Sequence, residues 1–563
     1  MVARCKLLTI ALAAAAAGGA MASADDSTHP AEERAARQKP RIMFYHDGRH
    51  PLIYMYEPPI QKEEFAAAVD ELVGTPIEAI LFCLGDGRTV LHDTKVGELW
   101  GHNVNKWPHA VFLRAHRNAK MLIEEGHDPL QLICDRAHAK GKLLYATLLV
   151  QQGTGERGKD TRTSDFRLNN RRLEIGAKGG LDSNFPGLDY LDFKHQEVRD
   201  ERFALIHETL TRYPVDGLEL QLNYGTHYFH PAEVNEGREI MTKWIARVYR
   251  AVKQSDAGRE LAIRVPASVD GCLSVGLDVR EWIRQGIVDV LIGQTLQYSE
   301  LLNSMADFGP LVEAANGSSC RIHAAIHSHV DSDRLGEANV AMIRAAACNY
   351  WAQGVDGLLL AHWFGNWPYD GTFYEKLREL PDPEIMAAKD KFYYLPTVTG
   401  RYPTPRLELG VKIPLPIDLK LNQPADLKMT ISDELLRWDK VGRVHKVLLR
   451  IRVMNATEQD RLSIGLNGKV LPDSLLRKIN QTYRMSAPRY RTGSGYWFVY
   501  DLDREHWPVT GNNTLQITLT KRDPDFIQQI HVRDVELETK YLMGKNFHRG
   551  EDPDLGPAKA SGI

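Results

Sequence analysis

Eight short apolar runs alternate with stretches of helical spacing across the first two thirds of this chain. The runs are 41–45, 79–84, 142–150, 215–222, 261–266, 288–293, 321–326 and 355–361. The helical stretches between them are 61–73, 111–140, 196–213, 232–255, 278–286, 299–317 and 336–353. Alternation of this kind predicts a parallel sheet, and eight such units predict a (β/α)8 TIM barrel. A doubly wound open sheet is the alternative, but the turn 85–88 lacks the glycine pattern that binds phosphate in that fold.

The pattern changes after Pro381. Alternating runs without a helical repeat follow at 407–413, 426–432, 444–454, 461–471, 495–502, 513–521 and 530–541. Short alternating runs separated by turns predict an all-β sandwich. We therefore expect a barrel over 40–395, a β-sandwich over 396–543 and a flexible tail over 544–563.

Residues 1–24 have the features of a secretory signal peptide. A short basic region precedes an apolar run from Leu7 to Ala17, and Ala22-Ser23-Ala24 offers a cleavage site. The run is shorter than the roughly 20 residues that a membrane-spanning helix needs. The charged, Ala-rich segment 25–39 is typical of a disordered lead-in. We expect a protein that is secreted or periplasmic, without a membrane anchor.

Charge and cysteine content narrow the class of function. The net charge is −3 over 563 residues, which does not suit nucleic-acid binding because that function needs a basic surface. Five cysteines follow the signal segment, an odd number without a CxxC pair, so no disulfide framework is indicated. They are Cys83, Cys134, Cys272, Cys320 and Cys348. We interpret them as small buried hydrophobic residues.

The run at 215–223 has two chemically different faces. Its leucines occupy even positions, whereas Glu219, Gln221 and Asn223 occupy odd ones. Because side chains alternate between the two faces of a strand, the polar row lies on one face. In a parallel barrel neither face meets bulk water, so we expect this row to point into the barrel near its mouth.

A Val-Asp pair marks the start of three apolar runs, and each pair comes after a helical stretch. The aspartates are Asp216, Asp289 and Asp356. They lie at the N-terminal ends of their predicted strands, the end of a barrel that carries stability and not chemistry. We interpret all three as turn and capping residues.

Glu219 and Asp47 are the candidate catalytic residues, because both fall near the C-terminal ends of predicted strands, where barrel active sites lie. Glycosidic bonds are cleaved by two carboxylates, one of which acts as an acid. An apolar environment would suit Glu219 to that role. The alternatives are a structural pair between Glu219 and Arg264 on the next strand, and a capping role for Asp47 before Gly48.

The other strand ends and their loops supply groups that suit a sugar, since amide, guanidinium and imidazole groups bond hydroxyls and aromatic planes stack on pyranose faces. The candidate substrate-binding residues are Asp86, Arg162, Arg167, Asn223, Arg264, Gln294, His327, His362, Trp363 and Asn366. Arg162 and Arg167 are either solvated loop residues or ligands of a substrate carboxylate. Trp363 is either a core residue or part of the lining.

Metal chemistry is the competing hypothesis for these residues. His327-x-His329 has a spacing that can bind a metal, and other histidines at strand ends could join it. No aspartate, lysine or cysteine pattern completes such a site, so we predict no metal and no cofactor. A GxSxG elbow is also missing from the sequence, so serine-nucleophile chemistry has no support.

Three phrases of the barrel segment resemble the family-10-like glycosyl hydrolase proteins of secreted bacterial type. They are Asp216–Leu220, Gly276–Asp289 and Trp351–Gly357. The resemblance covers roughly residues 40–370 and implies a barrel that cleaves a poly- or oligosaccharide. A weaker similarity to inverting barrel sialidases implies an acidic sugar, with Asp47 in the place of their aspartate. A third possibility is a non-catalytic carbohydrate-binding barrel, because Gln221 and His327 stand where carboxylates would favour hydrolysis.

Overall fold

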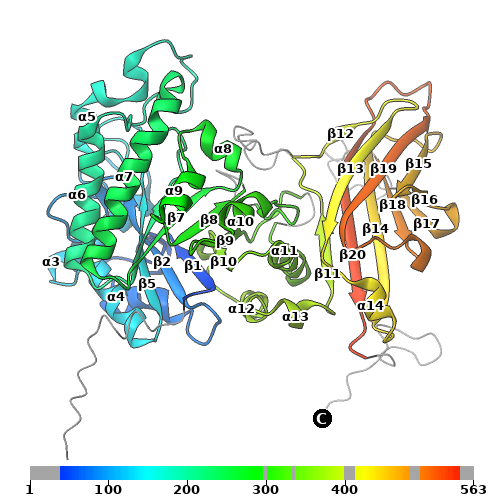
Figure 1. The fold of residues 1–563 in the computed structure, drawn as a ribbon, viewed down its shortest axis with the longest axis horizontal. Helices are drawn as coiled ribbons and strands as arrows, with labels where there is room; N and C mark the ends of the chain where they lie inside the picture. Colours follow the sequence, from blue (N-terminus) through cyan, green and yellow to red (C-terminus); the bar gives the residue numbers. More distant parts are fainter. Residues whose placement is uncertain are drawn as a thin grey trace, which may run out of the picture.

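The computed structural model describes residues 39–151, 153–295, 301–332, 336–398, 413–480 and 495–544. Within these ranges the chain forms a barrel and, beside it, a smaller β-domain (Figure 1). The predicted signal peptide, almost all of the lead-in, the tail beyond residue 544 and most of the predicted run 407–413 lie outside the described residues.

Eight parallel strands form a closed ring, which confirms the predicted (β/α)8 barrel. They are β1 (Ile42–His46), β2 (Ala79–Asp86), β5 (Leu143–Leu149), β6 (Gly217–Gln221), β7 (Glu260–Pro266), β8 (Val290–Gln294), β9 (Arg321–Ile326) and β10 (Gly357–Leu360). The ring closes because β1 pairs in parallel with both β10 and β2. Two short strands after β2, namely β3 (Thr89–Val90) and β4 (Glu98–Leu99), extend the sheet outside the ring.

Helices cover the outside of the ring. The main ones are α2 (Lys62–Asp70), α3 (Ala110–Glu124), α4 (Pro129–Ala139), α6 (Gln196–Arg212), α7 (Val234–Ser255), α9 (Val279–Gln285), α10 (Gly309–Ala315) and α11 (Val340–Ala352). The predicted helix 111–140 is thus two helices. The break occurs at Gly126, which has a φ of +83°, and α4 restarts with Asp128, whose side chain accepts a hydrogen bond from the Leu130 amide, followed by Pro129.

The N-terminal end of the barrel repeats one hydrogen-bonding device four times. An acidic residue lies just before a strand. Its carboxylate accepts a hydrogen bond from the backbone N–H of a residue at the start of the preceding strand, and its own backbone N–H donates to the carbonyl of that same residue. The four carboxylate–amide pairs are Glu78–Ile42, Asp216–Leu144, Asp289–Leu261 and Asp356–Ile322. The capping role predicted for the three aspartates is therefore confirmed, and we call these contacts the carboxylate clamps.

The second domain consists of two antiparallel sheets around one apolar core, as the alternating runs predicted. One sheet contains β11 (Lys391–Tyr394), β12 (Ile417–Asp418), β14 (Val444–Met454), β17 (Leu476–Asn480), β18 (Gly495–Asp501) and β20 (His531–Tyr541). The other contains β13 (Pro424–Ile431), β15 (Arg461–Leu466), β16 (Lys469–Val470) and β19 (Gly511–Lys521). Because β11 pairs with β20, the sandwich begins before the expected boundary at residue 396.

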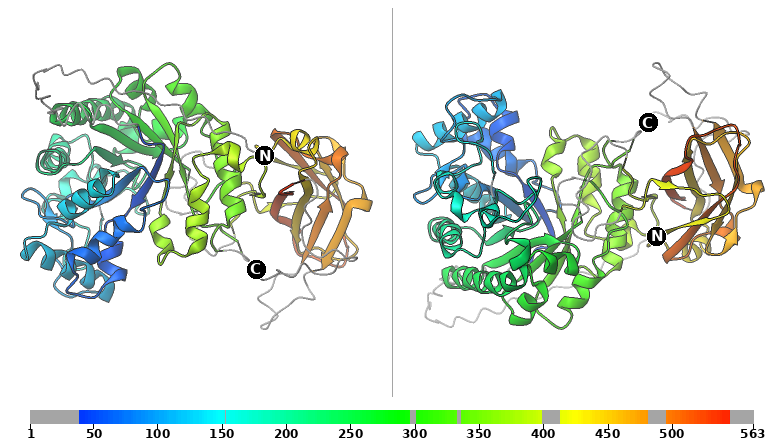
Figure 2. Two further views of the ribbon diagram at one scale, coloured as in Figure 1. Left: turned by 90° about the horizontal axis from the view of Figure 1, so that it is seen from below. Right: turned by 90° about the horizontal axis from the view of Figure 1, so that it is seen from above.

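The sandwich packs against the side of the barrel, where α11 faces β11 (Figures 1 and 2). Asn349 of α11 is buried at this contact, and its amide nitrogen donates to the carbonyls of Ser304 and Thr430, each at 2.8 Å. The hydroxyl of Ser304 in turn donates to the carbonyl of Tyr394 at 3.1 Å. The sandwich therefore braces the helical layer of the barrel.

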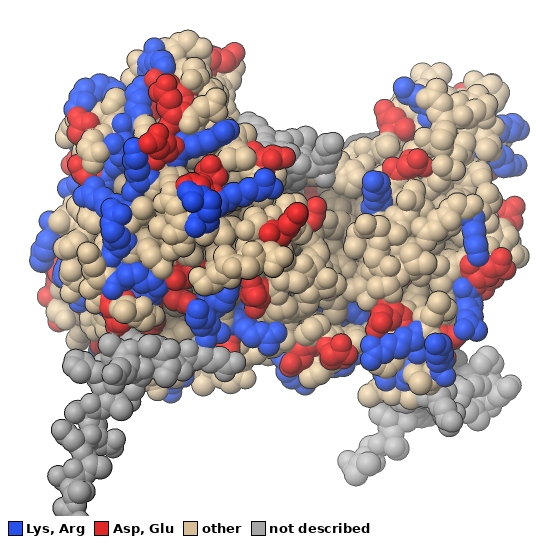
Figure 3. Space-filling model, viewed as in Figure 1, with Lys and Arg blue, Asp and Glu red and all other residues tan. Residues whose placement is uncertain are grey.

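Charged side chains of both signs are interspersed over the face of the molecule in Figure 3. This distribution agrees with the near-neutral net charge. No helix within the described ranges is long and apolar enough to cross a membrane.

Candidate functional site

The polar row of β6 points into the barrel, as its alternation predicted. Leu218, Leu220 and Leu222 belong to the outer core beneath the helices. Glu219 faces the opposite way and bonds side chains of both neighbouring strands, Thr147 on β5 and Arg264 on β7. The two inward groups that follow, Gln221 and Asn223, are almost fully buried.

Glu219 has a partner for each of its carboxylate oxygens. Its Oε1 lies 2.6 Å from Nε of Arg264, and its Oε2 accepts a hydrogen bond from the Thr147 hydroxyl at 2.5 Å. Both members of the ion pair are fully buried, and the Arg264 guanidinium lies 4.4 Å above the ring of Tyr45. These contacts match the alternative interpretation of Glu219, in which it forms a structural pair with Arg264 on the next strand. In this arrangement the carboxylate orients Arg264, and each of its oxygens already has one partner.

Four buried side chains at the C-terminal end of the ring retain hydrogen-bonding capacity. They are Gln221 through Oε1, Asn223 through Oδ1, Arg264 through Nη1 and Nη2, and His327 through both ring nitrogens. None of these atoms has a hydrogen-bond partner among the residues that the structure describes. Buried polar groups are usually paired, so this set, which we call the barrel floor, has the character of a ligand site.

His327 is uncharged at neutral pH. Burial, together with the positive charges of Arg264 and His329, lowers the pKa of His327 to about 3. A neutral imidazole has one donor and one acceptor nitrogen, so His327 can serve a hydroxyl in either direction. Its ring lies 6.1 Å, centroid to centroid, from that of His362, whose pKa burial also lowers well below its usual value.

Two aspartates and two arginines, at the end of β2 and in the segments after β1 and β5, contact one another, and we call this group the rim. Asp47 accepts hydrogen bonds from the backbone amides of Arg49 and His50. The Arg49 guanidinium lies between the two aspartates, with Nε 3.5 Å from Asp47 Oδ2 and Nη1 3.8 Å from Asp86 Oδ2. Arg162, from the long loop after β5, approaches Asp86 from another side, also at 3.8 Å. Asp47 therefore caps the turn after β1, as one of the two alternatives for it predicted, and it also contacts the Arg49 side chain.

Arg49 and Tyr224 were not singled out from the sequence, although both follow barrel strands. Arg162 donates to the Tyr224 hydroxyl at 3.1 Å, which joins the loop after β5 to the loop after β6. Asp86 is almost completely buried, yet its Oδ2 has no hydrogen-bond partner in the described part of the chain. Position after a strand was the only signal that could have identified Arg49 and Tyr224.

Of the adjacent residues Trp363 and Phe364, it is Phe364 that contacts side chains of the barrel mouth. Trp363 is fully buried, its indole donates to the carbonyl of Ile326 at 2.8 Å, and its ring packs on Phe373 of α12 (Gly371–Arg378). Half-buried Phe364 lies edge-on to Tyr45 and to His362. The prediction that Trp363 binds substrate is therefore replaced by a core role.

Arg167 also has a structural position. It is fully buried within its own loop, where it donates to the carbonyls of Asp189 and Gly155 and pairs with Glu174 at 2.8 Å. These contacts use its guanidinium to hold the loop together. Of the two arginines predicted in this loop, Arg162 alone reaches the rim.

Two further predicted residues lie at the mouth, one at a strand end and one in the segment beyond a strand. Gln294 is the last residue of β8 and is buried. Asn366 accepts a hydrogen bond from the Ser328 hydroxyl at 2.8 Å, which connects the segment after β10 to the end of β9. The Nδ2 of Asn366 has no partner among the described side chains and backbone groups.

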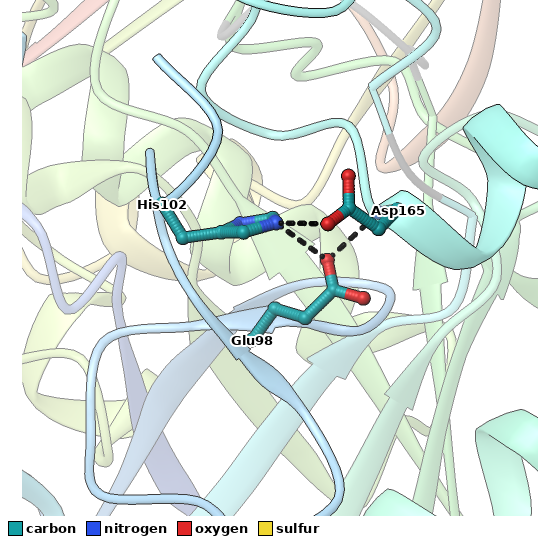
Figure 4. Close-up of side chains that lie close together, drawn as sticks. All are labelled: Glu98, His102 and Asp165. Carbon is teal, nitrogen blue, oxygen red and sulfur yellow. Dashed lines mark hydrogen bonds and ion pairs between the residues drawn. The ribbon is translucent and has the colours of Figure 1, made fainter. Parts of the chain in front are cut away.

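One group of potential metal ligands occurs among the described residues, and it lies outside the histidines considered from the sequence. Nε2 of His102 is 3.2 Å from an oxygen of Glu98 and 3.2 Å from one of Asp165 (Figure 4). Arg88 pairs with Glu98 at 3.1 Å and Arg157 pairs with Asp165, so both carboxylates already have cationic partners. The group links the loop after β2 to the loop after β5 without requiring a cation.

A cavity of about 650 Å³ lies at the opposite, N-terminal end of the barrel. Glu78, His138 and Lys142 line it, and Glu78 belongs to a carboxylate clamp. Because that end of a barrel carries stability, the C-terminal mouth remains the candidate site.

Comparison with known proteins gives no family for this chain. No family model and no curated protein matches it. A cycloisomaltooligosaccharide glucanotransferase from Paenibacillus sp. matches at 12% identity with a TM-score of 0.34, over 88% of this chain and 57% of that one. An endo-beta-1,4-mannanase from Thermotoga petrophila matches at 11% identity with a TM-score of 0.41, over 89% of this chain and 98% of that one.

The glycoside hydrolase domain of PgaB (BpsB) from Bordetella bronchiseptica matches at 11% identity with a TM-score of 0.38, over 61% of this chain and 98% of that domain. The chain spans little more than half the length of the glucanotransferase. The mannanase and the PgaB domain are glycoside hydrolases by name, but similarity at this level carries no argument about the activity of this chain. The resemblance to family-10-like proteins stays a prediction.

Proposed function

We propose that this chain is a glycoside hydrolase that binds a poly- or oligosaccharide at the C-terminal mouth of its barrel. The observation that carries the proposal is the barrel floor, where buried amide, guanidinium and imidazole groups retain hydrogen-bonding capacity at the same end of the barrel as Asp47 and Asp86. Sugar hydroxyls both donate and accept hydrogen bonds, so they match such a mixed set. The polar row within an apolar lining is typical of a ligand site.

Asp47 and Asp86 are the carboxylate pair of the proposal. They flank a single guanidinium, that of Arg49, and Oδ2 of Asp86 lacks a hydrogen-bond partner within the described ranges. Glu219 remains the residue that orients Arg264, because both of its oxygens are engaged. In this chemistry one carboxyl group protonates the leaving oxygen and the other activates water or attacks the sugar.

Hydrolysis of a glycan panel tests the proposal, with new reducing ends as the readout. We expect Asp47→Asn and Asp86→Asn each to fold and to lose about 100-fold to 10,000-fold in activity, as is usual for a lost acid or base. Asp165→Asn, which removes a carboxylate from the neighbouring loop, should retain activity. Binding without turnover by the unsubstituted protein would instead identify a carbohydrate-binding barrel, and full activity of both variants would exclude this pair.

Export is part of the same proposal, supported by the signal-peptide pattern of residues 1–24. Expression of the full chain in a bacterial host should give a periplasmic or secreted protein whose N-terminus is Asp25. A cytoplasmic product that starts at Met1 would contradict it.

A further inference from the structure

The charged groups of the mouth balance one another. Arg264 pairs with Glu219 at 2.6 Å, Arg49 lies between Asp47 and Asp86, and Arg162 faces Asp86. Three guanidinium groups thus face three carboxylates. His327 and His362 add no charge at neutral pH, because burial lowers the pKa of each. The described contacts of the mouth therefore leave no uncompensated cation for an anionic ligand.

A substrate carboxylate in this site would be a fourth anion among three cations. Glu219, Asp86 and Arg264 are all at least nine-tenths buried, so the added charge would be poorly solvated. Burying a charge without a partner costs free energy that a hydrogen bond does not recover. Charge balance therefore argues against the acidic sugar that Arg162 and Arg167 suggested from sequence, and Arg167 is already paired with Glu174.

The floor also needs a ligand that donates as well as accepts. Glu219 occupies the Nε side of the Arg264 guanidinium, so Nη1 and Nη2 are left to bind two acceptor oxygens. Gln221 Oε1 and Asn223 Oδ1, in contrast, are acceptors that require donors. A carboxylate accepts only, whereas each hydroxyl of a vicinal pair can accept from the arginine and donate to an amide oxygen.

We propose that the barrel floor binds an uncharged sugar residue, with hydroxyls held by Arg264, Gln221 and Asn223. This inference rests on the proposed function, since it assigns the substrate class of the same site.

Matched oligosaccharides test the charge of the ligand. β-1,4-linked oligomers of glucose and of mannose are compared with glucuronate and mannuronate oligomers of the same linkage, within a wider panel of neutral and uronate-bearing glycans. We expect a neutral glycan to be bound and cleaved. Its Kd should be at least about tenfold lower than that of its uronate counterpart, a difference of about 1.4 kcal/mol in binding free energy. Its affinity should also be unchanged between about 50 mM and about 500 mM NaCl, because no charge pair is screened.

The outcomes separate the two proposals. Tighter, salt-sensitive binding of a uronate glycan would overturn the inference and leave the hydrolase proposal intact. Failure to bind or cleave any glycan in the panel would overturn the proposed function and the inference with it.

A variant pair tests the floor itself. Gln221→Leu should weaken binding of the neutral glycan about tenfold through one lost hydrogen bond, while the thermal midpoint stays equal or rises. Gln131→Leu, which removes an amide from the exposed face of α4, is the matched control and should bind normally. Unchanged binding by Gln221→Leu in a folded protein would remove Gln221 from the site.

Discussion

Nε of Arg264 lies 2.6 Å from Oε1 of Glu219, and neither side chain is exposed. The carboxylate that the sequence placed at the barrel mouth is therefore half of a buried ion pair. Such a pair stabilises the fold only while both partners are present, because each charge alone would be buried without compensation. Removal of Glu219 should therefore also displace Arg264.

Glu219→Gln should destabilise the protein by about 3–5 kcal/mol, since it leaves the Arg264 charge without its partner. Replacement of both residues in Glu219→Leu/Arg264→Met should restore most of that loss, because no charge remains buried. Chemical denaturation of Glu219→Leu, of Arg264→Met and of the double variant measures this coupling. Additive losses would mean that the pair does not act as a unit.

Trp363 and Phe364 are adjacent but should respond differently to substitution. Trp363→Ala removes a fully buried indole and should cost about 3–5 kcal/mol of stability, with little change in KM for the folded fraction.

Phe364→Leu keeps a similar volume and should cost less than about 1.5 kcal/mol of stability. We expect KM to rise about threefold to tenfold, because an aromatic contact contributes about 0.5–1.5 kcal/mol. Denaturation curves and steady-state kinetics of the two variants provide the comparison. The reverse pattern would place Trp363, and not Phe364, in the site.

Acid should destabilise the fold through buried histidines. Burial lowers the pKa of His327 and of His323 from 6.5 to about 3, and that of His46 and of His92 to about 4. Well above pH 6.5 these histidines are neutral in both the folded and the unfolded chain, so they do not make the unfolding free energy depend on pH. As the pH falls below 6.5 the unfolded chain gains protons that the folded chain does not, so stability decreases until the folded pKa is reached.

His327→Gln should reduce this dependence. The difference in unfolding free energy between pH 7.5 and pH 5 should shrink by about 2 kcal/mol, since each titrating group contributes about 1.4 kcal/mol per pH unit. His207→Gln, on the exposed face of α6, serves as the control and should leave the difference unchanged. An equal difference in the His327 variant and the unsubstituted protein would show that this histidine is protonated in the fold.

The carboxylate clamps predict a local effect at the N-terminal end of the barrel. Asp289→Asn weakens the hydrogen bond from the Leu261 amide, at 2.7 Å, and the contact with Lys253. We expect a loss of about 1–3 kcal/mol, typical of a hydrogen bond to a charged group. Hydrogen exchange should accelerate at Leu261, whereas the equivalent amide of Ile322 should keep its protection. Uniform acceleration over all strands would contradict a local role.

The barrel was predictable because its strands are buried on both faces and its helices on one, so the strands appear as short apolar runs and the helices as a periodic pattern. The inward direction of Glu219 followed from alternation along β6 alone. The direction of Trp363 did not follow, because His362 has a φ of +58° and this left-handed residue interrupts the alternation after β10. Arg162 and Arg167 could not be separated from sequence, since both lie in an irregular loop whose path depends on tertiary contacts.

The sandwich was predicted from its alternating runs, but its first strand, β11, was not. β11 has only four residues and follows a short helix, so its apolar run does not distinguish a strand from a barrel connection. Its pairing with β20 joins residues far apart in the chain, which no local pattern encodes.

The four clamps divide the ring into strand pairs that are consecutive in the chain: β1 with β2, β5 with β6, β7 with β8 and β9 with β10. Every carboxylate and the amide that it binds are therefore encoded within one module of two β/α units. A chain break between α7 and β7 would leave two complete clamps on each fragment. We therefore expect the barrel to tolerate reassembly from separately expressed halves, and circular permutation at the module boundaries.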